Sequence, residues 1–265
     1  MIFCHGNGCD IGSMQYTLSV FARELNMYII SFEYPAYGLC TATSPNHETI
    51  NNHAERTFCF VRDVFRWPTE RIIIYGHSIG SGAACYLAST QMIAALILQS
   101  PYTAIRNIVR EKAGILSIFV SGRSWDNLDA MKKIQCPVLF IHGKADTLIP
   151  SNHSETLHDA CVNTEGKKLI ILPKEDHNSM SEDTLLKYIT PFLNKQHAHL
   201  DPTLRLPHIR IDDQLRVQPS IALDTNSNGG VLNSLFAMSK ASTAATRSAL
   251  NKISGAETNR SDDTE

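Results

Sequence analysis

The chain has 265 residues, 43% hydrophobic and 19% charged, a composition that is ordinary for a globular protein and excludes full disorder. Its 24 Lys and Arg and 26 Asp and Glu residues give a net charge of −2, which argues against nucleic acid or an anionic membrane as the main partner. Among 10 Phe, 8 Tyr and 2 Trp residues, only Phe236 lies beyond residue 195. We therefore expect a folded domain over residues 1–195 and a low-complexity, mostly disordered tail over residues 196–265.

Short apolar segments alternate with longer segments of helical periodicity along the chain. A strand-and-loop signal opens the chain, and further strands are predicted at residues 26–34, 71–75, 93–98, 137–142 and 168–172. Helices are predicted at residues 48–65, 79–89, 153–161 and 181–195, and one more near residues 231–253. Apolar strands without polar alternation are buried on both faces, so this order predicts an α/β fold with a mostly parallel sheet covered by helices.

Several classes of site have no signal in the sequence. Seven cysteines form neither a CxxC motif nor a paired framework, so we expect reduced thiols in a reducing compartment. No apolar run approaches the ~18–20 residues of a membrane span, and we expect no signal peptide. The His, Cys and carboxylate spacings indicate no metal, and the glycines indicate no phosphate loop. We expect no cofactor and no nucleic-acid partner, and the oligomeric state stays open.

A strand runs into a Gly-x-Ser-x-Gly motif and then a helix at residues 72–80, which read Ile-Ile-Ile-Tyr-Gly-His-Ser-Ile-Gly. A serine on such a sharp turn needs very small residues two positions before and after it, which Gly76 and Gly80 provide. The following helix also directs backbone N–H groups toward negative charge that forms beside the serine. Ser78 is therefore the predicted nucleophile.

A nucleophilic serine needs a general base, and the base needs an orienting carboxylate. Asp146 follows the predicted strand at 137–142, and His177 follows the predicted strand at 168–172. Either residue alone could be an ordinary loop residue. Their order after Ser78, and their positions at the ends of successive parallel strands, favour a catalytic triad at one edge of the sheet.

When Ser78 attacks a carbonyl group, the carbonyl oxygen becomes an oxyanion that needs two N–H donors. The backbone N–H of Ile79, directly after the nucleophile, is the first. The second should come from the loop after an earlier strand, where we expect the backbone N–H of Asn7, with Gly8 as second choice. Asp10 is expected to cap the following helix rather than to act in catalysis.

The chain reads HGN at residues 5–7, FEYPAYG at 32–38, YGHSIGS at 75–81 and QSP at 99–101. With these motifs, the sequence over residues 2–195 resembles the α/β-hydrolase superfamily. Within it, the chain is similar to the α/β-hydrolase domain-containing protein 17 group and its relatives. That group is associated with the removal of palmitate from cysteines of membrane-attached proteins. The resemblance implies an α/β-hydrolase fold and protein depalmitoylation, with Ser78 as nucleophile, Asp146 as acid and His177 as base.

The start of the chain is short for this superfamily, in which the His-Gly loop follows the third strand, because only four residues precede His5. We therefore expect an N-terminally truncated domain that lacks the first two strands. The protein 17 group carries a cysteine-rich N-terminal segment that is palmitoylated, so peripheral membrane association would depend on the missing part. The expected partner is an acylated protein or a lipid ester, and the expected location is the cytoplasm, at the cytosolic face of membranes.

Two other functions stay open. A serine peptidase, or a lipid or carboxyl esterase, would use the same triad. An inactive, truncated hydrolase-like binding protein would keep the fold without the chemistry. The insert between residues 98 and 137 is too short for a large cap domain, so we expect an open site. The apolar run at residues 113–120 is either a wall for an acyl chain or a helix that packs on the sheet.

Overall fold

The computed structural model describes residues 1–40, 45–111, 124–163, 165–197, 206–207 and 209. The chain divides into Met1–Ile209 and Arg210–Glu265, and the described residues all belong to the first of these units. The expected tail helix near 231–253 and the apolar run at 113–120 lie outside the described residues. Within the described part, no helix has both the length and the apolar character needed to cross a membrane.

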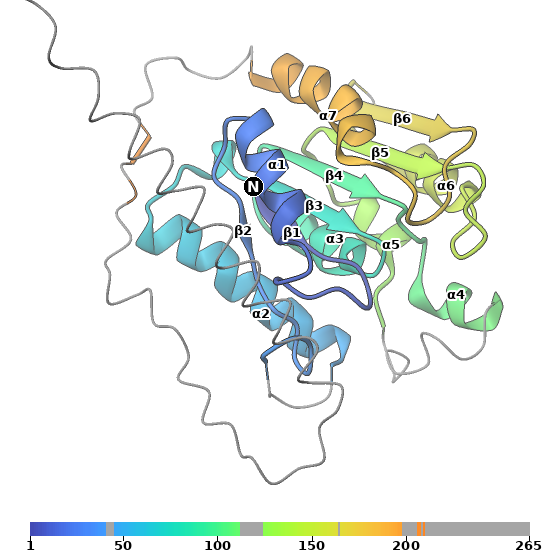
Figure 1. Ribbon diagram of the computed structural model, residues 1–265, viewed down its shortest axis with the longest axis horizontal. Helices are drawn as coiled ribbons and strands as arrows, with labels where there is room; N and C mark the ends of the chain where they lie inside the picture. Colours follow the sequence, from blue (N-terminus) through green and yellow to red (C-terminus); the bar gives the residue numbers. More distant parts are fainter. Residues whose placement is uncertain (41–44, 112–123, 164, 198–205, 208, 210–265) are drawn as a thin grey trace, which may run out of the picture. The chain divides into compact units, whose positions relative to one another are not determined.

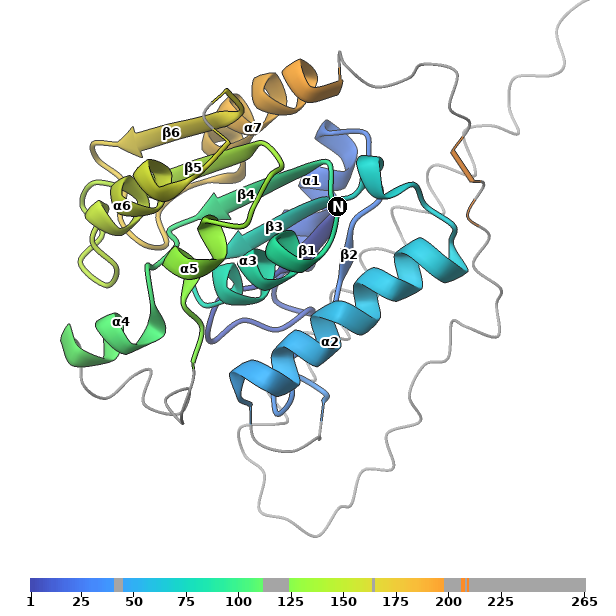
Figure 2. The same cartoon turned by 180° about the vertical axis from the view of Figure 1, so that it is seen from behind.

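The described strands form a single parallel sheet in the order β2-β1-β3-β4-β5-β6 (Figures 1 and 2). All five strand pairs are parallel, and β1 lies between β2 and β3. The expected parallel α/β sheet is thus confirmed, and the carboxyl ends of its strands gather at one edge. The strands are β1 (Ile2–Cys4), β2 (Ile30–Ser31), β3 (Ile73–His77), β4 (Ala95–Gln99), β5 (Val138–Gly143) and β6 (Lys167–Leu172).

Helices cover both faces of the sheet, which explains why its central strands are apolar throughout (Figures 1 and 2). On one face, α1 (Gln15–Glu24) and α7 (Glu182–His197) bury Phe21, Ile189 and Phe192 against β3, β4 and β5. The other face is covered by α2 (His47–Cys59), α3 (Gly80–Thr90), α5 (Asn127–Met131) and α6 (Asn152–Ala160). A further helix, α4 (Ile105–Glu111), follows β4.

The ends of most predicted helices and strands lie within two residues of the observed ends. Among the strands, the exception is the segment predicted at 26–34, which is much shorter in the structure. Only Ile30 and Ser31 pair there, because β1 beside them has just three residues and β2 is the last strand on that side. The predicted helix at 48–65 ends as an α-helix at Cys59 and continues as a π-helical turn over Phe60–Val64.

The expected cap at Asp10 is also wrong. Helix α1 begins at Gln15, and the preceding Met14 makes no side-chain cap. The Asp10 carboxylate instead accepts a hydrogen bond from the Ser13 N–H at 2.6 Å, inside the turn before the helix. Asp10 therefore shapes the loop between β1 and α1 rather than the helix end.

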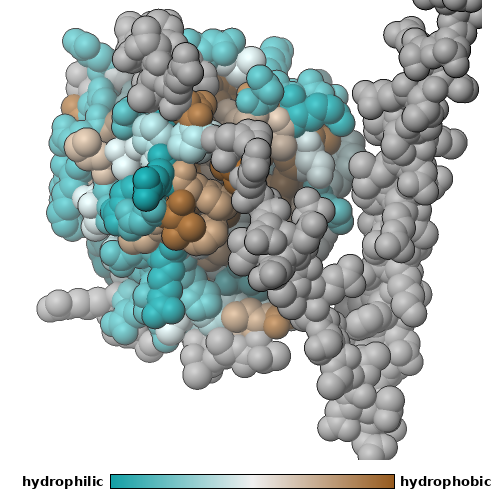
Figure 3. All heavy atoms as spheres, turned by 90° about the vertical axis from the view of Figure 1, so that its left-hand side faces the viewer, coloured by the Kyte–Doolittle hydropathy of each residue, from teal (hydrophilic) through white to brown (hydrophobic). Residues whose placement is uncertain are grey.

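A groove of about 260 Å³ lies beside the outer strand β2, away from Ser78. Figure 3 views this side of the molecule and shows apolar atoms gathered on it. The apolar side chains that line the groove include Met1, Tyr28, Phe65, Trp67 and Leu206.

Candidate active site

Ser78 lies at the sharp turn between β3 and α3. Its φ of +53° falls in the left-handed region, which costs a non-glycine residue roughly 1–2 kcal/mol. Hydrogen bonds hold the turn on both sides. The Ser78 N–H donates to the Gln99 carbonyl at 2.9 Å, and the Ser81 hydroxyl donates to the Ser78 carbonyl at 2.7 Å. A strained serine fixed in this way is typical of a nucleophile that follows a strand.

The two predicted glycines lie where no side chain fits. A Cβ atom on Gly76 would lie 2.6 Å from the Cβ of Ala84, and one on Gly80 would collide with the backbone carbonyls of Cys4 and His5. The first contact lets α3 pack directly on β3. The second brings the start of α3 against the end of β1, so the two segments expected to supply oxyanion donors are neighbours.

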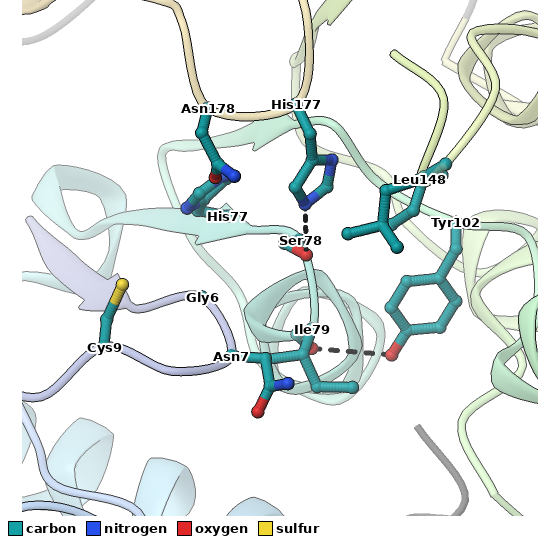
Figure 4. Close-up of a pocket in the computed structure, with 11 residues that line it drawn as sticks. Gly6, Asn7, Cys9, His77, Ser78, Ile79, Tyr102, Leu148, His177 and Asn178 are labelled. Atoms are coloured by element: carbon teal, nitrogen blue, oxygen red, sulfur yellow. Dashed lines mark hydrogen bonds between the residues drawn. The ribbon is translucent and has the colours of Figure 1, made fainter. Parts of the chain in front are cut away.

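The structure brings Ser78, Asp146 and His177 together in one hydrogen-bonded series. Atom Nε2 of His177 lies 2.8 Å from Ser78 Oγ (Figure 4), and Nδ1 lies 2.6 Å from Asp146 Oδ2. Because a carboxylate only accepts, Nδ1 carries the proton and Nε2 accepts from the serine hydroxyl. All three side chains are buried, with His177 the most exposed residue at 8%. This tautomer is the one in which a histidine can take the serine proton.

Asp146 lies in a turn after β5, and backbone N–H groups of this turn donate hydrogen bonds to the Asp146 carboxylate. Its Oδ1 atom accepts the N–H groups of Leu148 and Ile149 at 2.9 and 2.8 Å. Burial alone would raise the pKa of Asp146, but hydrogen bonds from His142, His177 and the Ile149 N–H outweigh it and hold that pKa well below its usual range. The group facing His177 is therefore a carboxylate.

His77 packs against His177. The two rings stack with centroids 5.6 Å apart and planes 30° apart. Burial above all, and then the neighbouring His177, lowers the pKa of His77 to about 4. His77 is therefore uncharged at neutral pH.

Ile79 and Asn7 lie on the side of Ser78 opposite His177 (Figure 4). Ile79 directly precedes α3, so its N–H is among those with no acceptor inside the helix. Asn7 lies in the loop after β1, where its side-chain oxygen accepts a hydrogen bond from the Tyr37 hydroxyl. Gly8, the second choice, has a φ of +76° and is not among the residues that line the cavity beside Ser78.

The loop after β1 is anchored by the fully buried His5. The Tyr34 hydroxyl donates to the His5 carbonyl at 2.8 Å, and the His5 Nε2 atom lies 3.2 Å from Glu33 Oε1. The second oxygen of Glu33 accepts the Ile11 N–H at 3.0 Å. Burial lowers the pKa of His5, although the nearby Glu33 opposes it. Residues that follow β2 thus hold the loop that carries Asn7.

A cavity of about 200 Å³ opens beside Ser78. Figure 4 shows Tyr102 and Leu148 on one side of the serine, with Cys9, His77 and Asn178 on the other. One side of the cavity is an apolar wall of Ile79, Tyr102, Leu148 and Ile149, which was not predicted from the sequence as a binding surface. A usable signal was present, since Tyr102 follows β4 closely and two apolar residues come just after Asp146.

The described residues contain no group of three or more His, Cys, Asp and Glu side chains arranged to hold a metal ion. The seven cysteines are free thiols, three of them buried and four half-buried. Burial raises the pKa of Cys9, the one thiol that lines the cavity. Cys9 is therefore a thiol rather than a thiolate at neutral pH.

Comparison with known proteins places the chain in a family. A family model described as Serine hydrolase (FSH1) matches residues 35–178, more than half of the chain. Human alpha/beta hydrolase domain-containing protein 17B is 30% identical over 161 residues, which are 61% of this chain and 54% of that protein. Alpha/beta hydrolase domain-containing protein aho-3 of Caenorhabditis elegans is 29% identical over 161 residues, or 61% and 47% of the two chains. The chain thus spans about half the length of these two curated relatives.

Solved structures share the fold at low sequence identity. Est1E from Butyrivibrio proteoclasticus, with ferulic acid bound, has a TM-score of 0.62 and 18% identity over 74% of this chain and 88% of its own. The Pyrococcus furiosus esterase Pf2001 has a TM-score of 0.59 and 16% identity over 73% and 81%. The fold is that of the α/β-hydrolases, as the resemblance implied. With the family match over residues 35–178, the chain belongs to the serine hydrolase (FSH1) family.

Proposed function

We propose that this chain cleaves acyl thioesters or esters through an acyl-serine intermediate, and that its substrates are S-palmitoylated proteins. The observation that carries the chemistry is the hydrogen-bonded series from Ser78 through His177 to Asp146, beside a cavity at the sheet edge. A hydroxyl, a base and an orienting carboxylate in this order are the parts that acyl transfer needs.

The first half of the reaction forms the acyl-serine. Ser78 Oγ attacks the carbonyl carbon while His177 Nε2 takes the hydroxyl proton. The N–H groups of Ile79 and Asn7 stabilise the oxyanion, and Asp146 stabilises the protonated ring. The bond to the leaving sulfur or oxygen then breaks, and His177 returns the proton to it.

The second half regenerates the enzyme. A water molecule gives a proton to His177 Nε2 and attacks the acyl-serine carbonyl. The second tetrahedral intermediate collapses, Ser78 Oγ recovers the proton, and the carboxylic acid leaves. The same two N–H donors serve both intermediates because the carbonyl oxygen keeps its position.

The acyl class is supported by the apolar side of the cavity. Tyr102, Leu148 and Ile149 offer a wall on which a hydrocarbon chain can leave water. The choice of protein-bound palmitate rests on the resemblance to the protein 17 group. A substrate of this kind would be met at the cytosolic face of membranes.

A fluorophosphonate probe separates an enzyme from a binding protein that only shares the fold. We expect the full chain to be labelled and Ser78→Ala to show no labelling. Ser89→Ala is the matched control, since the Ser89 hydroxyl bonds only the Tyr86 carbonyl within α3. A folded wild type that stays unlabelled, or labelling that survives in Ser78→Ala, would overturn the proposed chemistry.

A substrate panel then tests the bond and the acyl group. Matched acyl thioesters, acyl esters and peptide amides are compared by kcat/KM, and we expect the thioesters to be the best substrates. Each CH₂ buried on the apolar wall adds about 0.8 kcal/mol, or roughly fourfold in kcat/KM. A higher kcat/KM for peptide amides would indicate a peptidase, and no gain in kcat/KM with acyl-chain length would indicate a small-ester hydrolase. Either result would contradict depalmitoylation.

A further inference from the structure

A second histidine contacts the carboxylate that orients His177. His142 is the next-to-last residue of β5, and its side chain is fully buried. Its Nε2 atom lies 2.8 Å from the Ile149 carbonyl oxygen and 3.2 Å from Asp146 Oδ2. Its Nδ1 atom lies 2.7 Å from the hydroxyl oxygen of Ser154, a fully buried residue of α6.

These partners fix where the protons lie. The Ile149 carbonyl can only accept a hydrogen bond, so Nε2 of His142 carries a proton. The other nitrogen of a singly protonated ring is an acceptor, and the Ser154 hydroxyl donates to it. In this tautomer the His142 N–H is shared between the Ile149 carbonyl and Oδ2 of Asp146. The acceptors at Nε2 fix this tautomer, and the Ser154 hydroxyl holds the other side of the ring. Loss of that hydroxyl would leave Nδ1 buried without this partner, so the ring could turn or shift away from Oδ2.

The Asp146 carboxylate is consequently held by four N–H groups. Oδ1 accepts the backbone N–H groups of Leu148 and Ile149, and Oδ2 faces the ring N–H groups of His177 and His142. The backbone groups fix one oxygen only. On Oδ2, the atom that orients His177, His142 is the second N–H donor beside His177 itself.

We propose that Ser154 and His142 act as a positioning pair, with Ser154 holding the ring of His142 so that its N–H keeps Oδ2 of Asp146 in line with His177. The inference rests on the proposed function, because an oriented Asp146 matters only if His177 takes up a proton. Neither residue of the pair lines the cavity beside Ser78. Their loss should therefore lower kcat and leave KM nearly unchanged, since it affects the charge that develops on His177 and not the binding of substrate.

The test uses three variants in the full chain. His142→Leu removes the N–H, His142→Gln keeps an N–H donor near the place of Nε2, and Ser154→Ala removes the hydrogen bond that holds the ring. Thr156→Ala is the matched control, because the exposed Thr156 hydroxyl on the same helix bonds only the Asn152 carbonyl. With a short p-nitrophenyl acyl ester as probe, we expect kcat to fall about 10- to 100-fold in His142→Leu and about 10-fold in Ser154→Ala. His142→Gln should recover most of the loss, and KM should stay within about twofold.

A spectroscopic readout is independent of turnover. The proton on Nδ1 of His177, in its short bond to Asp146, should give a downfield signal in the proton NMR spectrum of histidine-labelled protein. We expect this signal to move or broaden in Ser154→Ala and His142→Leu, and to be unchanged in Thr156→Ala. If the wild type fails to label with fluorophosphonate but the signal responds as expected, the proposed function falls and the positioning contact stands.

The outcomes against the pair are equally distinct. Full kcat and an unchanged NMR signal in Ser154→Ala would overturn it. So would a loss in kcat that His142→Gln does not recover, or a rise in KM that matches the fall in kcat, since both would indicate a general packing role. If His142→Leu does not fold, Ser154→Ala and His142→Gln decide by the same criteria.

Discussion

The Tyr37 hydroxyl donates a hydrogen bond to the side-chain oxygen of Asn7, which ties the loop after β2 to the loop after β1. Since the Asn7 N–H is the proposed second oxyanion donor, this bond orients a backbone group from outside its own loop. The donor side of the site is therefore built by two segments that are far apart in the sequence.

Tyr37→Phe removes this bond and leaves the ring in place. A neutral hydrogen bond contributes about 1 kcal/mol, so we expect kcat to fall about fivefold with little change in the melting temperature. Steady-state kinetics with an acyl ester measures the effect. Tyr86→Phe, which removes a hydroxyl that bonds Glu55 on the α2–α3 side, is the control and should keep full activity. Equal activity in the two variants would contradict the role of the Asn7 N–H as an oxyanion donor that Tyr37 orients.

Asp146→Asn tests the orienting carboxylate. An amide can place an NH₂ group toward Nδ1 of His177 and so favour the wrong tautomer, for which we expect kcat to fall by about 10⁴. Fluorophosphonate labelling should slow in parallel while the fold is kept. Asp159→Asn changes an exposed carboxylate on α6, beside His158, and should behave as the wild type. A loss below tenfold would show that another group orients His177.

Gly80→Ala tests the close approach of α3 to β1. Alanine is otherwise the better helix residue, but its Cβ would meet the backbone carbonyls of Cys4 and His5. We expect a loss of stability of roughly 1–3 kcal/mol or more, measured by urea unfolding. Gly12→Ala is the comparison, since its nearest contact would be a side-chain oxygen of Asp10 at 3.3 Å. Equal stability of the two variants would mean that α3 can move away from β1 without loss.

Stability should fall in mild acid because of His77. Its pKa is lowered to about 4 in the fold, first by burial, whereas an unfolded histidine titrates near ~6.5. Between these values the unfolded chain binds the proton and the folded chain does not, so stability is lost as the pH falls. The expected contribution from pH 7 to pH 4.5 is about 2 kcal/mol. Urea unfolding of His77→Gln at both pH values should show a smaller loss, and an equal loss would assign the acid sensitivity elsewhere.

The parts of the site that the sequence predicted are those tied to strand ends. Ser78, Asp146 and His177 each follow an apolar strand, and parallel strands bring their carboxyl ends to one edge whatever the details of packing. Gly76 and Gly80 could be predicted because a serine on such a sharp turn leaves no room for side chains two residues before and after it. These inferences require only the order of elements and the shape of one turn.

The parts that escaped prediction depend on contacts between segments. His142 reads as one more residue of an apolar strand, and only the fold brings Ser154 to its ring. The length of β2 is limited by its short neighbour β1, so only two of the nine residues at 26–34 pair, although the segment is rich in β-branched and aromatic residues. Tertiary pairing limited the strand where propensity favoured a longer one.

The shortness of β2 bears on how the protein would lose activity. Two half-buried residues pair this strand to the sheet, whereas β3, β4 and β5 are paired on both sides and almost entirely buried. Segments with few buried contacts open locally at a lower free energy than the whole domain. Fraying that starts at β2 would release Tyr37 and Glu33 from the Asn7 loop while Ser78 and His177 stay in place. In rising denaturant, turnover would then disappear before the global unfolding transition, and amide exchange would be fastest at this margin of the sheet.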